Sequence, residues 1–335
     1  MRLFLVMMHD TITIGSSTID YFIYTDSSLI KIKSPKGEKD LIAYPSGSKL
    51  LVKKLIVETG GGGTNTAATF SRFGLKTGWL GVAGNDEAGK KVIAEMKKFR
   101  VDFLGKIKNG MTGTSFILDS IEHDRTVLTY KGVNDEFNDK DIDLKKIECK
   151  LLYLTSLTGK SFSIYNKILP YAKKHNAIVV LNPSAYLAGM GAKKLSGVLK
   201  DTDILICNDE EAALLVGKSS LEKMSMAITW YGPKISIITL GKKGVFCYDK
   251  KYFYNIKAHH VRVAESLGAG DAFGSAFSAA YLKTKDIELS LRIGLANAES
   301  VIQKIGAKKG ILSWDNAVKM ANKQHEIKKV MVKNK

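Results

Sequence analysis

Short runs of consecutive apolar residues alternate along the chain with segments in which apolar residues recur at helical spacing. Runs of this kind, rich in Val, Ile and Leu, are typical of strands, and the periodic segments are typical of amphipathic helices. Regular alternation of strand and helix indicates βαβ units, which place parallel strands in one sheet. Because apolar residues are consecutive within each run, we expect these strands to be covered on both faces. The expected strands are Thr11–Ile14, Gly78–Val82, Leu151–Leu154, Ile178–Leu181, Ile204–Ile206 and Ile235–Leu240.

Helical patterns fill most of the sequence between these strands. They cover Ala67–Phe73, Gly89–Phe99, Ile164–His175, Glu210–Val216, Ala272–Leu282 and Leu289–Ile305. Two stretches depart from the alternation, since Tyr21–Glu58 and Thr112–Val133 contain strand patterns and turns but no helical pattern. Two β-rich excursions from one α/β body most simply pair into a small accessory sheet. The sequence therefore predicts an α/β fold with a doubly wound, mostly parallel sheet and a second, smaller β-sheet.

The charge of the chain narrows its range of partners. Its 335 residues include 51 Lys and Arg against 33 Asp and Glu, which gives a formal net charge of +18. Only six of the basic residues are Arg, and Lys is spread over the whole sequence, whereas nucleic-acid readers usually gather both in one stripe. We therefore expect no nucleic-acid partner, and small anionic substrates remain compatible with the surface. A ligand-binding regulator or a nucleic-acid binder that kept the fold is the rival hypothesis.

Cysteine usage and hydropathy indicate the compartment. Cys149, Cys207 and Cys247 are far apart in the sequence and form no Cys-x-x-Cys pair, which fits a reducing compartment and argues against a disulfide framework or a thiolate zinc site. The apolar run Leu3–Met8 is too short for the core of a signal peptide or for a membrane span. We expect a cytoplasmic protein without a membrane partner.

A glycine turn before a helix is the strongest candidate for chemistry. The strand-like stretch His260–Val263 is followed by Gly268, Ala269, Gly270 and Asp271, and then by a helix rich in small residues. Main-chain N–H groups at a helix N-terminus form an anion site when no side chains obstruct them. A lone Asp in this place is usually a cap, but a cap does not explain the small residues before it. Phosphoryl transfer to a hydroxyl requires such an anion cradle beside a carboxylate that accepts the hydroxyl proton.

A second glycine run, Gly60–Gly63, stands between the strand-like stretch Leu55–Glu58 and a helix, and Thr64 and Asn65 follow it. Glycines let the backbone approach a ligand closely, and the Asn65 amide both donates and accepts hydrogen bonds. A flexible turn whose Thr64 or Asn65 caps the helix explains the run at least as well. Neither glycine run fits Gly-x-Gly-x-x-Gly, which removes the main support for a dinucleotide dehydrogenase.

Further motifs follow expected strands, where ligands bind in α/β sheets. The oxygen ligands of Asn208–Glu211 suit Mg²⁺, often through water, although a helix N-terminus with acids in its first turn is the common alternative. Thr239–Gly244 is either an ordinary turn or a nucleotide loop. Thr158–Ser161 has the sequence Thr-Gly-Lys-Ser, like the end of a P-loop, but Leu154 stands where a P-loop has its first glycine.

Taken in their order along the chain, these motifs resemble the signatures of the PfkB, or ribokinase-like, family of carbohydrate kinases, and the resemblance covers nearly the whole sequence. Gly62–Ala67, with Gly74 and Gly84 after it, is similar to the N-terminal signature, and Ser266–Ser278 is similar to the C-terminal signature. Gly15–Asp20 resembles the substrate motif of the first strand. The shorter matches are Asn208 and Glu211 to Asn-x-x-Glu, and Thr239, Gly241 and Gly244 to Thr-x-Gly-x-x-Gly.

The resemblance implies an ATP-dependent kinase that moves the γ-phosphate to a primary hydroxyl. It also implies that the two β-rich excursions form the lid of the family. The α/β kinase core would then comprise residues 1–20, 59–111 and 134–335, and the β lid residues 21–58 and 112–133. An exposed lid sheet could pair with a second copy of the chain into a homodimer.

By the same resemblance, Asp271 is the general base and the main-chain amides of Gly268, Ala269 and Gly270 form the anion hole. The other implied residues are Asn208 and Glu211 for Mg²⁺, through water; Thr239, Gly241, Gly244 and Asn297 for the nucleotide; and Asp20, Gly62, Gly63 and Asn65 for the secondary hydroxyls of the acceptor. Glu265 and Leu267 stand where the family usually has Asp or Asn and often has Thr, in a region that helps some relatives to hold a monovalent cation. Activation by potassium therefore stays open.

The residues leave the identity of the acceptor open. Asp20 and Asn65 suit the vicinal hydroxyls of ribose, of a ketohexose or of a nucleoside equally well. Aromatic residues of the expected lid, such as Phe22, Tyr24 and Tyr130, could stack on a nucleobase, although they more commonly form the core of such a sheet. Lysines and an arginine of the lid could meet the phosphate of a sugar phosphate. A free sugar ranks first, a nucleoside second and a sugar phosphate third.

Overall fold

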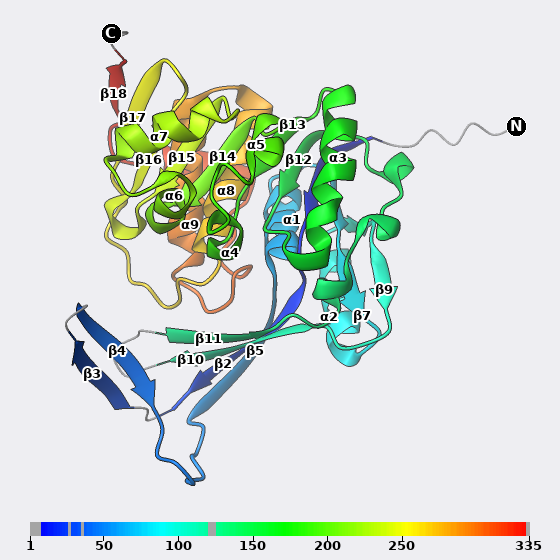
Figure 1. The fold of residues 1–335 in the computed structure, drawn as a ribbon, viewed down its shortest axis with the longest axis vertical. Helices are drawn as coiled ribbons and strands as arrows, with labels where there is room; N and C mark the ends of the chain where they lie inside the picture. Colours follow the sequence, from blue (N-terminus) through cyan, green and yellow to red (C-terminus); the bar gives the residue numbers. More distant parts are fainter. Residues whose placement is uncertain (1–7, 26–27, 35–36, 120–124, 333–335) are drawn as a thin grey trace, which may run out of the picture.

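Ten strands form the main sheet in the computed structural model of the protein, which describes residues 8–25, 28–34, 37–119 and 125–332 (Figure 1). In sheet order they are β18 (Lys328–Met331), β17 (Tyr252–Ile256), β16 (Val245–Tyr248), β15 (Ile235–Thr239), β14 (Ile204–Asn208), β13 (Ile178–Leu181), β12 (Cys149–Leu154), β1 (His9–Ile14), β6 (Thr77–Leu80) and β8 (Val101–Phe103). The strands from β15 to β8 pair in parallel, and β16, β17 and β18 add an antiparallel edge. The prediction of a doubly wound, mostly parallel sheet is confirmed.

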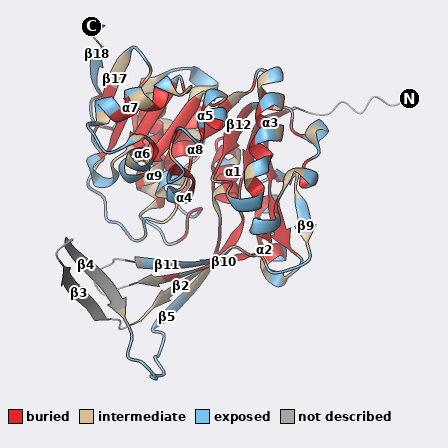
Figure 2. Cartoon of the chain, viewed as in Figure 1, coloured by how far each residue is buried: buried red, intermediate tan, exposed pale blue. Residues whose placement is uncertain are grey.

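Helices cover both faces of this sheet. Side chains alternate between the faces along each strand, so each strand packs against both helical layers. On β12, Leu152 and Leu154 pack against one helical layer, whereas Leu151 and Tyr153 pack against the other. The first layer contains α3 (Ser163–Lys174), α4 (Ala185–Ala188), α5 (Ser196–Lys200), α6 (Asp209–Val216) and α7 (Leu221–Trp230). The second contains α1 (Gly62–Arg72), α8 (Ala269–Thr284), α9 (Ile287–Val301) and α10 (Trp314–Ala321), and α2 (Glu87–Lys98) packs beside α1 and β8. Figure 2 shows the buried sheet between the partly exposed helices.

Two local predictions need correction. His260–Val263 is not a strand: it follows β17 and is paired with no strand in the described ranges. The last strong helical pattern ends at Val301 rather than at Ile305. The sequence patterns did not reveal α7 and α10, each of which begins with a serine cap. In the part of the chain that the structure describes, no helix has the length and apolar content to cross a membrane.

A second sheet lies beyond one end of the main sheet (Figure 1). Its strands, in order, are β11 (Arg125–Tyr130), β10 (Gly113–Asp119), β2 (Thr18–Tyr24) and β5 (Lys54–Gly60). Only residues 15–17 separate β1 from β2, so a central core strand leads directly into this sheet. Two small ribbons accompany it, formed by β3 (Ser28–Ser34) with β4 (Gly37–Ala43) and by β7 (Val82–Gly84) with β9 (Lys106–Lys108). The predicted accessory sheet is confirmed, while the domain limits stay a prediction.

Candidate active site

The carboxyl ends of core strands and the beginning of α8 surround a cavity of about 520 Å³. β14 ends at Asn208 and β15 ends at Thr239, and both residues line the cavity. Gly62 of α1, Glu211 of α6 and Asp271 of α8 line it as well. Residues from separate sequence motifs thus share one space, which we call the central cavity.

The turn that begins α8 requires glycine. Gly268 has a φ of 83°, which L side chains rarely adopt, and a Cβ at this position would lie 2.5 Å from the Cβ of Ala307. Gly268 and Gly270 line the central cavity and present their main chain to it at the N-terminus of α8. The N–H of Ala269 instead donates to the Ser266 carbonyl oxygen at 3.2 Å. The structure therefore brings two of the three expected anion-hole residues to the cavity.

Asp271 lies in the first turn of α8 and is held by Asn65 of α1. Asn65 Nδ2 donates to Asp271 Oδ2 at 3.0 Å. Burial raises the pKa of Asp271; the hydrogen bond from Asn65 and the positive charge of Lys308 oppose this shift, and the Asp20 carboxylate adds to it. A carboxylate with a raised pKa at the wall of a cavity suits a proton acceptor.

Lys308, which no sequence motif singles out, is a buried cation behind Asp271. Its Nζ donates to the Thr59 carbonyl oxygen at 2.6 Å and to Asn65 Oδ1 at 3.0 Å, and lies 3.4 Å from Glu95 Oε2. The Thr59 hydroxyl also donates to Glu95. Burial lowers the pKa of Lys308, and the charges of Glu95 and Asp20 oppose that shift. Its partners come from β5, α1 and α2, so nothing near it in the sequence reveals its place.

Asp20 lies on β2 of the second sheet, is buried, and does not line the central cavity. Its Oδ1 accepts a hydrogen bond from the Thr18 hydroxyl at 2.8 Å, and burial raises its pKa. A Cβ at Gly60 would lie 1.8 Å from Asp20 Oδ2, so the glycine leaves room for this carboxylate. The negative charges of Asp20 and Asp271 both act on Lys308. One ammonium thus interacts electrostatically with an acid of the second sheet and with an acid of α8.

The neighbouring glycines Gly62 and Gly63 are placed differently. Gly62 lines the central cavity. Gly63 is buried, and a Cβ on it would lie 2.5 Å from the Gly15 carbonyl oxygen and 2.7 Å from Trp79 Nε1. Its N–H donates to the Ser16 carbonyl oxygen at 3.1 Å. The structure therefore gives Gly63 a packing role between α1 and the end of β1.

The two side chains expected to hold Mg²⁺ form a reciprocal cap of α6. The Glu211 N–H donates to Asn208 Oδ1 at 2.7 Å, and the Asn208 N–H donates to Glu211 Oε2 at 3.0 Å. Burial raises the pKa of Glu211, and the charge of Asp271 adds to this shift. Mg²⁺ in proteins is usually held by one or two carboxylates together with water and substrate phosphates. The neighbouring carboxylates of Glu211 and Asp271, whose charges interact, fit such a site. No cluster of three His, Cys, Asp or Glu side chains that could hold a metal ion exists in the described residues.

A second cavity, of about 320 Å³, opens beside the glycine turn. Thr239, Gly241 and Gly244 line it, and Gly270 borders both this cavity and the central one. Its apolar wall, which the sequence motifs do not reveal, includes Val245, Val263, Phe273, Leu295, Ala298 and Ile302. An apolar slot that meets a phosphate-sized glycine turn suits the base and the phosphates of a nucleotide. We call it the nucleotide cavity.

Two other expected residues have structural partners. Asn297 does not line the nucleotide cavity: it is fully buried, its Nδ2 donates to the Ala272 carbonyl oxygen at 2.9 Å, and its Oδ1 accepts from the Leu312 N–H at 3.0 Å. Asn297 therefore ties α9 to α8 and to the segment before α10. Glu265 Oε1 accepts from the Leu267 N–H at 2.8 Å and so stabilises the turn that precedes Gly268.

Comparison with known proteins gives consistent matches along the chain. A family model described as "pfkB family carbohydrate kinase" matches residues 12–314. An uncharacterized sugar kinase of Archaeoglobus fulgidus is 29% identical over 72% of this chain and 97% of its own length. The ribokinase of Bacillus subtilis is 26% identical over 91% of this chain and 96% of its own length.

Solved structures match the fold over nearly the full length. The ribokinase of Thermotoga maritima superposes with a TM-score of 0.75 at 23% identity, covering 94% of this chain and 99% of that one. The adenosine kinase of Sinorhizobium meliloti gives a TM-score of 0.80 at 20% identity, covering 93% and 99%. These likenesses establish a ribokinase-like fold.

Proposed function

The chain belongs to the PfkB family of carbohydrate kinases, and on that premise we propose that it transfers the γ-phosphate of ATP to a primary hydroxyl of a free sugar, ribose- or fructose-like. The protein is a phosphotransferase with an alcohol acceptor, and kinases of this family use ATP. Relatives named ribokinase and deoxyribokinase support a sugar as the acceptor. The observation that carries the proposal is the 3.0 Å hydrogen bond from Asn65 to Asp271, in a cavity that Gly268 also lines.

In the proposed reaction, Asp271 accepts the proton of the acceptor hydroxyl. The hydroxyl oxygen forms a bond to the γ-phosphorus while the bond from this phosphorus to the bridging oxygen of ADP breaks, so the products are a sugar phosphate and ADP. The raised pKa of Asp271 favours uptake of a proton from a weakly acidic alcohol. Asn65 orients the carboxylate that receives this proton.

The migrating negative charge meets the main chain of Gly268 and Gly270 at the positive end of α8. Asn208 and Glu211 would hold Mg²⁺, through water, and the bound ion would supply positive charge to the phosphates. The nucleotide cavity holds ATP, whose phosphates pass Gly270 into the central cavity. The second sheet acts as a lid that covers the acceptor, excludes water and limits wasteful hydrolysis of ATP.

A nucleoside kinase is the second candidate. Tyr130 of β11 is 52% exposed, and Tyr186, which lines a cavity next to the central one, is 79% exposed. Such rings can stack on a nucleobase. Phe22, in contrast, is buried, and Lys54 lies over the ring of Tyr24. Two of the aromatic residues considered for this role are therefore already packed.

A screen for ADP release tests the proposal. The acceptors are ribose, fructose, 2-keto-3-deoxygluconate, adenosine, cytidine and fructose phosphates, each with ATP and Mg²⁺. We expect turnover with a free sugar that is lost in Asp271→Asn and retained in Glu222→Gln, which changes an exposed acid of α7. Turnover with nucleosides alone favours the second candidate. Salt-dependent binding to nucleic acid without ADP release on any acceptor supports a non-catalytic binder instead.

We also infer that two copies pair through the lid in a reducing, cytoplasmic compartment. β5 and β11 are the edge strands of the lid sheet, and Leu55 and Leu128 on them are 56% and 54% exposed. The three cysteines are buried and free, which suits a reducing environment. Light scattering should give a dimer that Leu128→Lys dissociates; a wild-type monomer at micromolar concentration would contradict the pairing.

A further inference from the structure

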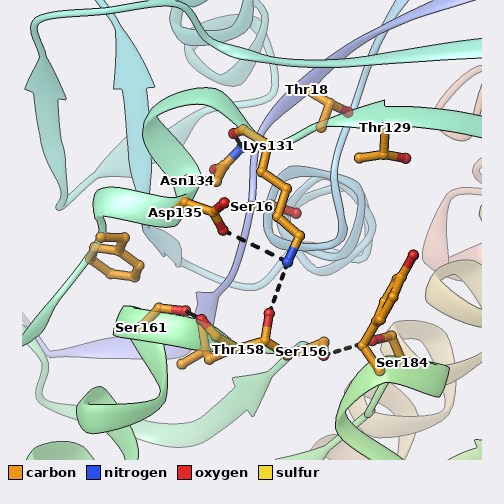
Figure 3. A pocket seen from close by; sticks show the side chains of 13 residues that line it. Ser16, Thr18, Thr129, Lys131, Asn134, Asp135, Ser156, Thr158, Ser161 and Ser184 are labelled. Atoms are coloured by element: carbon orange, nitrogen blue, oxygen red, sulfur yellow. Dashed lines mark hydrogen bonds and ion pairs between the residues drawn. The ribbon is translucent and has the colours of Figure 1, made fainter.

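A cavity of about 240 Å³ adjoins the central cavity, and the sugar-kinase reaction described above does not use it. The residues that it shares with the central cavity are Ser16, Ser156 and Ser184. Thr18, which binds Asp20, lines it too, so this side cavity lies on the acceptor side of the site. Figure 3 shows Lys131 reaching across it from the end of β11 toward Thr158. An acceptor longer than its reacting end would extend into this space.

Hydrogen-bond donors converge in the side cavity. Lys131 Nζ donates to Thr158 Oγ1 at 2.9 Å, and Ser184 Oγ donates to Ser156 Oγ at 2.7 Å. The hydroxyls of Thr158 and Ser156 therefore already accept a hydrogen bond, and their own protons have no acceptor among the residues that the structure describes. Together with the remaining N–H groups of Lys131, they can donate to one ligand group.

The charges around these donors favour a negatively charged ligand. Lys131 is 41% exposed, and its ion pair with Asp135 has a long N–O distance of 3.7 Å. Asp135 is 61% exposed, so solvent screens much of its charge. An ammonium beside two hydroxyl donors suits an anion, and a single ammonium balances a monoanion. No arginine lines the cavity in the described residues, and arginine is the usual partner for bidentate binding of phosphate.

We propose that the side cavity binds a carboxylate at the end of the acceptor opposite to its reacting hydroxyl, which makes the preferred acceptor a sugar acid. This inference rests on the proposed kinase function and replaces the neutral, ribose- or fructose-like sugar with a sugar acid as the preferred acceptor. Lys131, Thr158 and Ser156 hold the carboxylate, while Asp20 and Asn65 hold the middle of the sugar and its hydroxyl meets Asp271. Thr158 and Ser161 of the P-loop-like segment therefore contribute to acceptor recognition rather than to nucleotide binding, as both line this cavity. Lys160, between them, is exposed and does not line it.

Steady-state kinetics with matched acceptors test this specificity. We compare 2-keto-3-deoxygluconate, fructose and fructose 6-phosphate as acceptors in the wild type, in Lys131→Met and in Lys160→Met. Lys160→Met is the control, because it removes an exposed lysine two residues after Thr158. The sugar acid should be the best acceptor. Lys131→Met should lower its kcat/KM about 10- to 100-fold, as expected for a hydrogen bond to a charged group, and leave fructose unchanged. Lys160→Met should leave all three unchanged.

Three results overturn the proposal. The first is a preference for fructose that Lys131→Met does not alter. The second is a larger loss for fructose 6-phosphate than for the sugar acid, which makes the bound anion a phosphate. The third concerns binding alone: gluconate should raise the melting temperature of the wild type more than glucitol does, and an equal effect of both contradicts a carboxylate site. If no acceptor releases ADP, the kinase proposal fails, and this binding comparison still tests the cavity.

An independent observation assigns a role to Lys308, and we infer that it is a positioning residue for the base. Its contacts to Thr59, Asn65 and Glu95 use all three N–H groups of the ammonium, so it has none left for the acceptor. Because Lys308 donates to the Asn65 Oδ1, the Nδ2 of that amide is turned toward Asp271. Its positive charge also favours the ionised form of Asp271.

The pH dependence of turnover separates this role from a merely structural one. Lys308→Met should shift the acid limb of the kcat profile to higher pH, since removal of a nearby cation raises the pKa of Asp271. The KM for ATP should stay unchanged, and Lys308→Arg should restore most of the wild-type profile. Lys309→Met, which removes the exposed neighbouring lysine that pairs with Glu58, is the matched control. If Lys308→Met does not fold, Lys308→Met with Glu95→Gln removes both charges. An unshifted profile in a folded variant overturns the inference.

Discussion

The main sheet, here called the core sheet, and the second sheet, here called the lid sheet, hold their parts of the candidate active site in different ways. The consecutive residues Leu151–Leu154 of β12 are all buried, because helices cover both faces of the core sheet. On the lid, adjacent positions of β10 have opposite surroundings: Ile117 is 1% exposed and Phe116 is 39% exposed. One face of the lid packs inward, while the other meets solvent.

This difference matches the parts that the two sheets contribute. Asp271, the glycine turn and Glu211 belong to the core, where burial on both sides fixes the register of the strands and the positions of their ends. Asp20 lies on β2 of the second sheet, one residue before the predicted start of the lid, and this sheet is anchored through one face only. We infer that the core fixes the groups that react and the lid carries groups that adjust to the acceptor.

The strongest test of this division of roles is to neutralise one carboxylate that belongs to the core and one that belongs to the second sheet. Asp271→Asn should lower kcat about 10²- to 10⁴-fold, because a general base is lost. Asp20→Asn should act mainly on the KM for the acceptor. Steady-state kinetics with the best acceptor from the screen distinguish the two. A fall in kcat for Asp20→Asn as large as that for Asp271→Asn would contradict the division of roles.

Packing should differ between the sheets as much as chemistry does. Trp79 of β6 is fully buried, donates to the Gly15 carbonyl oxygen at 3.1 Å and stacks on Phe103. We expect Trp79→Ala to lower the free energy of unfolding by about 3–5 kcal/mol. Phe116→Ala, which removes a partly exposed ring stacked on Tyr21, should cost about 1 kcal/mol. Urea denaturation measures both, and equal losses would show that the lid is packed as tightly as the core.

A smaller effect is expected on the free energy of unfolding, which the burial of the Asp271 carboxylate lowers at high pH. Burial raises the pKa of Asp271 in the folded protein above its ordinary value, so the folded state binds this proton more tightly than the unfolded state does. Stability is therefore greatest below the unfolded-state pKa and declines as the pH rises through the folded-state pKa. Asp271→Asn should be more stable than the wild type at pH 8, with a difference that shrinks toward pH 4. A constant difference in melting temperature between these pH values would contradict the shift.

The sequence predicts the core better than it predicts the site. Consecutive apolar runs mark strands covered on both faces, and the two stretches without a helical pattern mark the lid, because these signals are local. His260–Val263 has an apolar pattern too, yet strand pairing depends on a partner that the local pattern does not contain. The motifs predict the position of Asp271 and Asn65, and the structure adds the hydrogen bond between them.

The remaining site residues depend on contacts that no local pattern encodes. Lys308 is one of 45 lysines, and only the approach of β5, α1 and α2 distinguishes it from the exposed ones. Asn297 and Gly63 are polar or flexible in the sequence, but the fold uses them for packing: one joins α8 to α9, and the other lets α1 approach β1. Spacing alone does not separate such residues from ligand-binding ones.

In the function that we propose, the three residues between β1 and β2 are the hinge of the lid. Ser16, the middle residue of this link, lines both the central and the side cavity. A rotation of the lid would change the backbone conformation around Ser16, beside the bound acceptor. A bound acceptor would therefore limit this rotation. The shape of the acceptor would then determine how far the lid closes, and a sugar of the wrong length would prevent full closure.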